Sequence, residues 1–281
     1  MKKLHYEFTG ETKKVFGVTL HRIRATRDLP NFGVKAGDEG GWIEHTGNLQ
    51  GKAWVADEAK VFGNAEVYQN ALVSDNARVY GDAKVYGSAK VYGDSQVYGN
   101  SKVYEYAQVH WGAEVFGNAQ VFDRAEVFGD AEVYGDALVA GGVKVYGDAT
   151  ISGNAKVYGD AWVYGDAWVC GYARVLGRAK VFGDAEVYGD VSVFADAHIE
   201  KDYDYLHVVT CTSKQFSLTL TRQKDGKHLI RMGCWLGTID EFDVLIAKPR
   251  WLETDYVVAD EARPEMEALA SMMRARIERW K

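Results

Sequence analysis

One pattern of apolar and polar positions repeats every six residues over more than half of the chain. Position 55 and every sixth position up to 199 carry an aliphatic residue, which makes 25 positions in one register. Alanine stands two residues earlier at 21 of these 25 sites. Glycine stands two residues after the aliphatic residue in 17 of 24 repeats, and Asp or Asn stands three residues after it in 16 of 24. The consensus is Ala-x-Val-Tyr/Phe-Gly-Asp/Asn, and Ile43 and Leu49 extend it backwards, so the array begins near residue 43.

A period of six fits neither a helix of 3.6 residues per turn nor an uninterrupted strand, but it suits a short strand followed by a turn. The alanine and the aliphatic residue, two positions apart, face the same side of such a strand. Glycine followed by Asp or Asn favours a corner, because these residues tolerate positive φ. Three sides then close a triangular coil of 18 residues, and the 25 sides predict about eight stacked coils.

Both ends of the array lack the repeat, as expected if they cover the open sheet edges of a coil stack. We predict an N-terminal β cap over residues 1–42, with a strand over 15–22, and a solenoid over residues 43–200. Residues 201–281 are predicted to form a small α+β domain. Its expected elements are strands over 207–212, 216–221 and 227–232, a helix that opens at a Thr238 and Glu241 capping box, and an amphipathic helix over 263–280 with Pro264 in its first turn.

Composition and charge narrow the class of protein. The chain has 281 residues, of which 47% are hydrophobic, and this excludes a disordered protein. Its net charge of -7 makes direct nucleic-acid binding unlikely. Three irregularly spaced cysteines favour a reducing compartment, and the sequence starts without an apolar signal segment, so we expect a cytoplasmic protein with no membrane association.

The repeat also carries a family resemblance. Units such as Ala131-Glu132-Val133-Tyr134-Gly135-Asp136 resemble the hexapeptide repeat of left-handed β-helix proteins, and the left-handed sense is implied by that resemblance. Within this superfamily the chain is similar to the YdcK-like hexapeptide-repeat proteins, chiefly through residues 22–44, which include the segment 34–44. Residues 233–242 resemble a segment of phage-encoded proteins. The resemblance implies a phage or prophage setting, in which a host component is captured or inhibited.

Many hexapeptide-repeat proteins are acyltransferases, and the resemblance implies for these a histidine base and an extruded loop. No loop interrupts residues 43–200. The array carries His45, His110 and His198, none with a recognisable second catalytic group, so His110 is the best available base for this alternative. We predict no catalytic residue, no cofactor and no metal ligand, and we favour a non-catalytic binding or scaffold protein.

Two places break the consensus with bulky or charged residues, and they are the predicted binding sites. Arginine beside aromatic rings is a common recognition surface. The first group consists of Tyr104, Glu105, Tyr106, His110, Trp111 and Arg124, and the second of Trp162, Trp168, Tyr172, Arg174 and Arg178. The partner expected at them is a host protein or a small molecule.

Three further features of the array leave alternatives open. Aromatic residues follow the aliphatic one in 17 of 24 repeats, which favours burial in a homo-oligomer, a dimer or trimer. Residues 53–200 carry 11 basic and 21 acidic side chains, which suggests an acidic DNA mimic as a second alternative, although scattered lysines and arginines weaken it. A column formed by Asp130, Asp148, Asp166 and Asp184 could recruit a cation such as calcium, or could be a set of corner residues.

Overall fold

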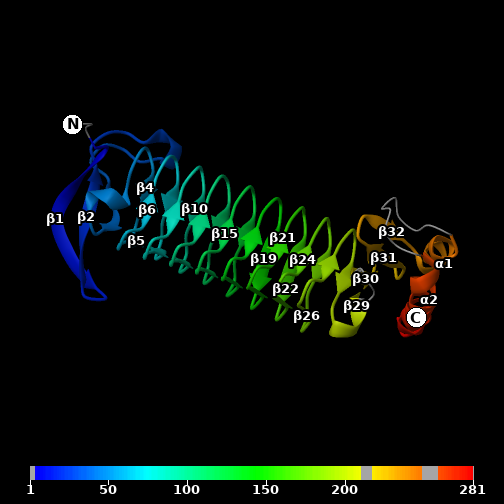
Figure 1. Ribbon diagram of the computed structural model, residues 1–281. Helices are drawn as coiled ribbons and strands as arrows, with labels where there is room; N and C mark the ends of the chain where they lie inside the picture. Colours follow the sequence, from blue (N-terminus) through cyan, green and yellow to red (C-terminus); the bar gives the residue numbers. More distant parts are fainter. Residues whose placement is uncertain (1–3, 210–216, 249–258, 281) are drawn as a thin grey trace.

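The structure, a computed structural model, describes residues 4–209, 217–248 and 259–280. The chain forms an elongated parallel β-solenoid with an antiparallel hairpin at its N-terminal end and a sheet with two helices at its C-terminal end (Figure 1). The predicted mainly β architecture with two capping ends is therefore confirmed.

Three sheets run along the solenoid, and each coil adds one short strand to each of them. The first sheet contains β1 (Tyr6–Val15), β2 (Val18–Ala25), β3 (Glu39–Ile43), β5 (Lys60–Val61), β8 (Arg78–Val79), β11 (Gln96–Val97), β14 (Glu114–Val115), β17 (Glu132–Val133), β20 (Thr150–Ile151), β23 (Trp168–Val169) and β26 (Glu186–Val187). The second contains β4 (Trp54–Val55), β7 (Leu72–Val73), β10 (Lys90–Val91), β13 (Gln108–Val109), β16 (Glu126–Val127), β19 (Lys144–Gly147), β22 (Trp162–Gly165), β25 (Lys180–Val181) and β28 (His198–Ile199). The third contains β6 (Glu66–Val67), β9 (Lys84–Val85), β12 (Lys102–Val103), β15 (Gln120–Val121), β18 (Leu138–Val139), β21 (Lys156–Val157), β24 (Arg174–Val175) and β27 (Ser192–Val193).

Stacking follows the 18-residue period without a shift. Val91, for example, pairs with Val109 in the next coil, and Val109 pairs with Val127. The solenoid has about nine coils and not about eight, because β3 pairs with β5 and Leu49 bridges to Val67, so stacking starts at Ile43, two sides before Val55.

The interior of the solenoid is a continuous column of alanine and valine side chains without solvent exposure. Two serines replace alanine in it, and both hydroxyls are satisfied: Ser95 donates to the carbonyl of Tyr92 at 2.9 Å, and Ser101 to that of Tyr98 at 2.8 Å. The column is narrow because the interior residues are small, and each coil contributes the same apolar contacts as the next.

Every predicted corner position adopts positive φ, whichever residue occupies it. Glycine fills 17 of these positions, and one complete corner column, from Gly63 to Gly189, consists of glycine alone. The other two columns contain the seven exceptions, which are Asp57, Gln69, Asp75, Glu105, Trp111, Asp123 and Ala195. Since a side chain in this conformation costs about 1–2 kcal/mol, each exception needs its own explanation.

The N-terminal cap continues the first sheet outwards. Strands β1 and β2 form an antiparallel hairpin, β2 pairs antiparallel with β3, and β3 joins the solenoid in parallel with β5. The strand predicted over residues 15–22 is confirmed for residues 18–22, which lie in β2, but its start is wrong, because Phe16 and Gly17, with φ of 51° and 82°, form the turn between β1 and β2. Alternation of side chains alone did not reveal a turn whose first residue is not glycine.

The C-terminal module is an antiparallel sheet of β29 (Tyr205–Val209), β30 (Ser217–Arg222), β31 (His228–Met232) and β32 (Trp235–Gly237), followed by α1 (Ile239–Ile246) and α2 (Ala259–Glu278). Its own apolar core includes Phe242 and Met266. The capping box at the start of α1 is confirmed. Helix α2 begins before the predicted residue 263, so Pro264 lies inside the helix and not in its first turn. The predicted strand residues 210–212 and 216 lie outside the described residues.

The same short turn follows the first side of the array and its last side. The 3-10 turns η2 (Thr46–Asn48) and η3 (Asp202–Asp204) each follow an isoleucine and a glutamate. Asn48 accepts the backbone N–H groups of Glu44 and His45 at 3.1 and 2.9 Å. Asp204 accepts those of Glu200 and Lys201, both at 3.0 Å. A buried side-chain acceptor therefore holds the turn after the first side of the array and the turn after its last side. The third 3-10 turn, η1 (Pro30–Phe32), lies in the cap.

Candidate functional site

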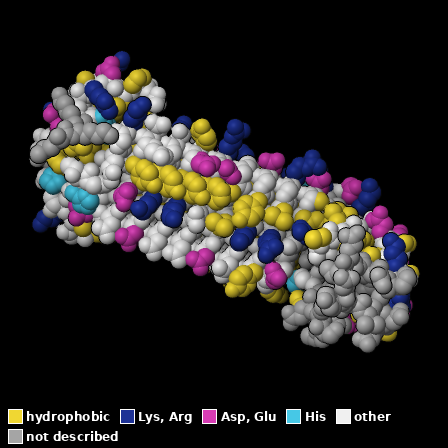
Figure 2. Space-filling view, turned by 45° about the horizontal axis from the view of Figure 1, so that its top comes forward, with side chains coloured by type: hydrophobic (Ala, Val, Ile, Leu, Met, Phe, Trp, Pro, Cys, Tyr) yellow, Lys and Arg dark blue, Asp and Glu magenta, His cyan; other side chains and the backbone are white. Residues whose placement is uncertain are grey.

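Aromatic side chains stack into ladders along the outside of the sheets. The second sheet carries the longest ladder, formed by Tyr92, His110, Phe128, Tyr146, Tyr164 and Phe182. Its neighbouring rings are nearly parallel, with centroids 4.6 to 5.1 Å apart. Figure 2 shows hydrophobic side chains gathered in rows along the solenoid, with charged side chains of both signs between them. The ring faces are thus covered within one chain.

His110 is a member of this ladder and not an exposed base. Its ring lies between those of Tyr92 and Phe128, at centroid distances of 4.6 and 5.1 Å. Its Nδ1 atom is buried and has no hydrogen-bond partner among the described residues. Burial lowers the pKa of His110, Glu126 opposes this shift and Lys144 adds to it. The imidazole is therefore neutral near pH 7, which suits a stacked ring.

The other two histidines of the array have structural surroundings. His45 caps η2, since its Nδ1 accepts the N–H of Gly47 at 3.1 Å. The ring of His198 packs edge-on against Phe182, and its Nε2 is buried without a partner in the described part of the chain. None of the three histidines is hydrogen-bonded to a nucleophile or a carboxylate among the described residues, so the geometry offers no support for acyl transfer.

We expect His110→Phe to stabilise the protein by about 1 kcal/mol at neutral pH, because the change extends the ladder and removes a buried nitrogen without a partner. The difference in free energy of unfolding between the variant and the wild type should widen as the pH falls from about 7.5 to about 5.5. The lowered pKa means that the unfolded chain takes up the proton first, near pH 6.5, so the wild type loses stability below that pH and the variant lacks this loss. Urea unfolding of both proteins at the two pH values measures this difference in stability. A variant less stable than the wild type throughout would show that the imidazole makes a needed contact.

Most of the corner residues that replace glycine compensate for their strained conformation. Each accepts a hydrogen bond from the backbone N–H of the corner residue in the next coil. Gln69 accepts from Gly87 at 2.7 Å, and Asp75 from Gly93 at 2.9 Å. In the same way, Asp57 accepts from Asp75 at 3.2 Å, and Asp123 from Gly141 at 3.1 Å. A carboxylate or amide therefore gains a bond at the corner that glycine cannot make.

Trp111 is the exception with a large side chain. It has a φ of 59°, no acceptor to offer, and 62% exposure. Its indole stands almost perpendicular to the rings of His110 and Phe128, with centroids 5.6 and 5.7 Å away. The ladder therefore holds Trp111 in place while most of its surface faces solvent. Strain of this kind in a displayed side chain marks a candidate site.

Tyr106 occupies the opposite corner of the same strand, β13, and is 65% exposed. Between the two corners lie the outward side chains of Gln108 and His110. We call Tyr106, Gln108, His110 and Trp111 the Trp111 edge. Sequence reasoning identified three of these residues and missed Gln108, whose Oε1 accepts the hydroxyl of Tyr92 at 3.4 Å. An outward polar residue of the repeat gave no signal of its own.

The remaining members of the first predicted group have other surroundings. Tyr104 lies in the ladder of the third sheet, stacked between Tyr86 and Phe122. Glu105 is at the corner beside Tyr106, and a hydrogen bond with the carboxyl of Asp123 raises its pKa. Arg124, one coil further on, is exposed, and no aromatic ring of the described residues lies beneath its guanidinium.

The structure does not bring the second predicted group together. Trp162 lies on the second sheet, Trp168 on the first and Arg174 on the third. Tyr172 and Arg178 lie at two different corners between them, so the five residues wind once around the solenoid. Arg178 pairs with Asp196 at 2.8 Å, and the cation above the Trp162 ring is that of Lys180, 4.3 Å from the ring centroid.

The aspartate column does not form a metal site within the described residues. No group of three or more His, Cys, Asp or Glu side chains there could hold a metal ion. Asp130, Asp148, Asp166 and Asp184 occupy equivalent corner positions of successive coils. The interpretation of these residues as corner formers is the one that the geometry supports.

No protein-family model matches the chain, and no curated protein matches it. In the described part of the chain, no helix combines the length and the apolar character needed to cross a membrane.

Proposed function

We propose that this protein is a non-catalytic binding protein whose solenoid presents the Trp111 edge to a partner protein. The supporting observation is Trp111 itself, a large and exposed aromatic residue at a corner with left-handed backbone conformation. Unlike the Asp and Gln residues at equivalent corners, it cannot accept the hydrogen bond that offsets the strain of this conformation. Exposed tryptophan and tyrosine on a rigid scaffold bury much apolar area at little cost in conformational entropy. The phage or prophage setting and the capture of a host component rest on the resemblance to YdcK-like proteins.

We expect Trp111→Gly to lose partner capture without losing stability. Relief of left-handed strain, about 1–2 kcal/mol, offsets the lost ring contacts, about 0.5–1.5 kcal/mol. The melting temperature should therefore change little. Affinity purification from bacterial lysate, with the wild type and the variant side by side and quantitative mass spectrometry, measures the capture.

Ala195→Gly is the matched control, because Ala195 has the same φ of 59° at a corner but carries no aromatic ring. It should capture the same partner as the wild type. Equal capture by Trp111→Gly would place the contact elsewhere on the molecule, and a large drop in its melting temperature would assign Trp111 a structural role.

We also propose that the protein self-associates, through a surface other than the Trp111 edge. Trp168, Tyr172 and Tyr188 lie in two adjacent coils and are 42%, 64% and 57% exposed. A second copy of the chain that covers them would remove this aromatic surface from water. Sedimentation of the purified protein at micromolar concentration tests the idea, and a monomer would exclude it.

A further inference from the structure

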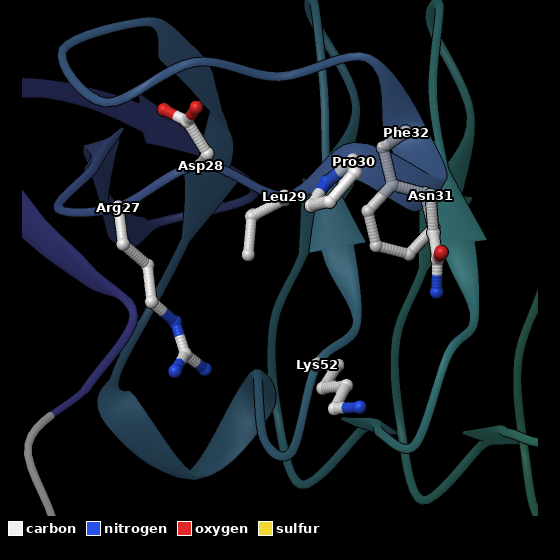
Figure 3. Close-up of a pocket in the computed structure, with 7 residues that line it drawn as sticks. All are labelled: Arg27, Asp28, Leu29, Pro30, Asn31, Phe32 and Lys52. Atoms are coloured by element: carbon white, nitrogen blue, oxygen red, sulfur yellow. The ribbon is translucent and has the colours of Figure 1, made fainter.

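The loop between β2 and β3 lies against the first coil and borders an open pocket of about 220 Å³. Its lining combines apolar and cationic side chains: Arg27, Asp28, Leu29, Pro30, Asn31, Phe32 and Lys52. Arg27 comes from the cap and Lys52 from the first coil, so the pocket exists only where these two parts of the chain meet. Figure 3 shows Arg27 and Lys52 on opposite sides of the space below Leu29.

The loop that forms the pocket is held by its own bonds. Leu29 and Val34 exchange two backbone hydrogen bonds, of 2.8 and 3.3 Å, around η1. Leu29 is 5% exposed and belongs to the core of the solenoid, and Phe32 packs against that core. The apolar wall is therefore fixed in place before any ligand arrives.

The charges of the pocket do not balance. Asp28, its one lining carboxylate, is engaged elsewhere: it accepts the N–H of Ala36 at 2.9 Å and pairs with Lys35 at 3.5 Å. In Figure 3 its carboxylate points away from Lys52. Arg27 and Lys52 have no ion-pair partner among the described residues.

Other cationic side chains of the cap, unlike Arg27, do form ion pairs. Lys13 and Arg22 pair with Glu58, at 2.7 and 3.0 Å, and Arg24 pairs with Glu39 at 3.4 Å. Buried His5 lies beside the pocket, its Nε2 2.8 Å from the carbonyl of Ala53. Burial lowers the pKa of His5, and Arg27 lowers it further, as expected beside an unbalanced positive charge.

We propose that this pocket binds a small organic anion, with its carboxylate or phosphate between Arg27 and Lys52 and its apolar body against Leu29, Pro30 and Phe32. A guanidinium offers a planar fork of donors to such a group, and the ammonium adds a second positive charge. The amide of Asn31 stands at the rim as a further donor. A ligand held in this way would link the cap to the first coil.

Calorimetric titration of the full chain with phenyl phosphate, benzoate and uncharged benzyl alcohol tests the proposal. The two anions should bind, more weakly as salt is added, and the alcohol should not. Arg27→Gln and Lys52→Gln should each weaken binding of the anions by about tenfold, since each removes a charged hydrogen bond. The control is Lys90→Gln, which changes an exposed lysine of β10, two coils along the second sheet from β4. This variant should bind the anions as the wild type does.

Both pocket side chains are exposed, so the variants should melt at the temperature of the wild type, which circular dichroism checks. Absence of binding by both anions would overturn the proposal. So would anion binding that survives unchanged in Arg27→Gln and Lys52→Gln, or binding of benzyl alcohol as tight as that of benzoate.

Discussion

Replacing Gly135 by alanine is expected to lower the free energy of unfolding by about 3 kcal/mol or more. Gly135 lies in the all-glycine corner column with a φ of +72°. A Cβ atom there would lie 2.9 Å from both the nitrogen and the oxygen of Gly153 in the next coil. These are backbone atoms that cannot rotate away, so the two coils would have to separate. Chemical unfolding followed by circular dichroism measures the loss.

Gly189→Ala provides a matched control for this change. Gly189 ends the same corner column with a φ of +78°, but no atom lies within 4 Å of the Cβ position. It should lose only the conformational term, about 1–2 kcal/mol. Equal losses in the two variants would show that backbone conformation, and not the close approach of stacked coils, makes glycine necessary at this corner.

The solenoid could be predicted because local preference and tertiary contact coincide in every repeat. The residue that tolerates positive φ is also the residue that lets the next coil approach, as at Gly135. Small interior side chains likewise fit both the strand and the narrow core. The left-handed sense rests on the resemblance, since a repeat period carries no hand.

The N-terminal cap and the C-terminal module were harder to predict, because local conformational preference and tertiary contact do not coincide there as they do in the repeat. Phe16 adopts positive φ in the hairpin turn, and Pro264 lies inside α2, both against local preference. One signal was present but was not used: Ile43-Glu44 precedes Asn48 at the same spacing as Ile199-Glu200 precedes Asp204. This shared spacing marks the buried turns η2 and η3, which follow the first and the last side of the array.

The candidate sites also differ in whether the repeat period reveals them. Trp111 could be identified from the sequence because it occupies a position where the repeat demands glycine. Trp162 and Trp168 are one repeat apart, so the period already places them on different sheets and separates the second predicted group. The pocket at Arg27 and Lys52 depends on the path of an irregular loop, which no periodicity reveals.

Replacing Asp204 by alanine is expected to lower the free energy of unfolding of the C-terminal end by about 3–5 kcal/mol. Asp204 is 1% exposed. Its carboxylate accepts the N–H groups of Glu200 and Lys201, both at 3.0 Å, and the guanidinium of Arg222 in β30 at 3.2 Å. Alanine leaves two backbone donors and one cation without their acceptor at the junction of the last coil and the C-terminal sheet.

Asp204→Asn separates the two roles of this carboxylate, because an amide oxygen can still accept both backbone N–H groups. Asn48 uses an amide for this purpose at the opposite end of the array. We therefore expect Asp204→Asn to lose only the attraction to Arg222, about 1–2 kcal/mol. Hydrogen exchange should quicken in β29 to β31 of the alanine variant while the central coils stay protected. If the asparagine variant exchanges as fast as the alanine variant, the ion pair with Arg222, and not the closing turn, holds the C-terminal module on the solenoid.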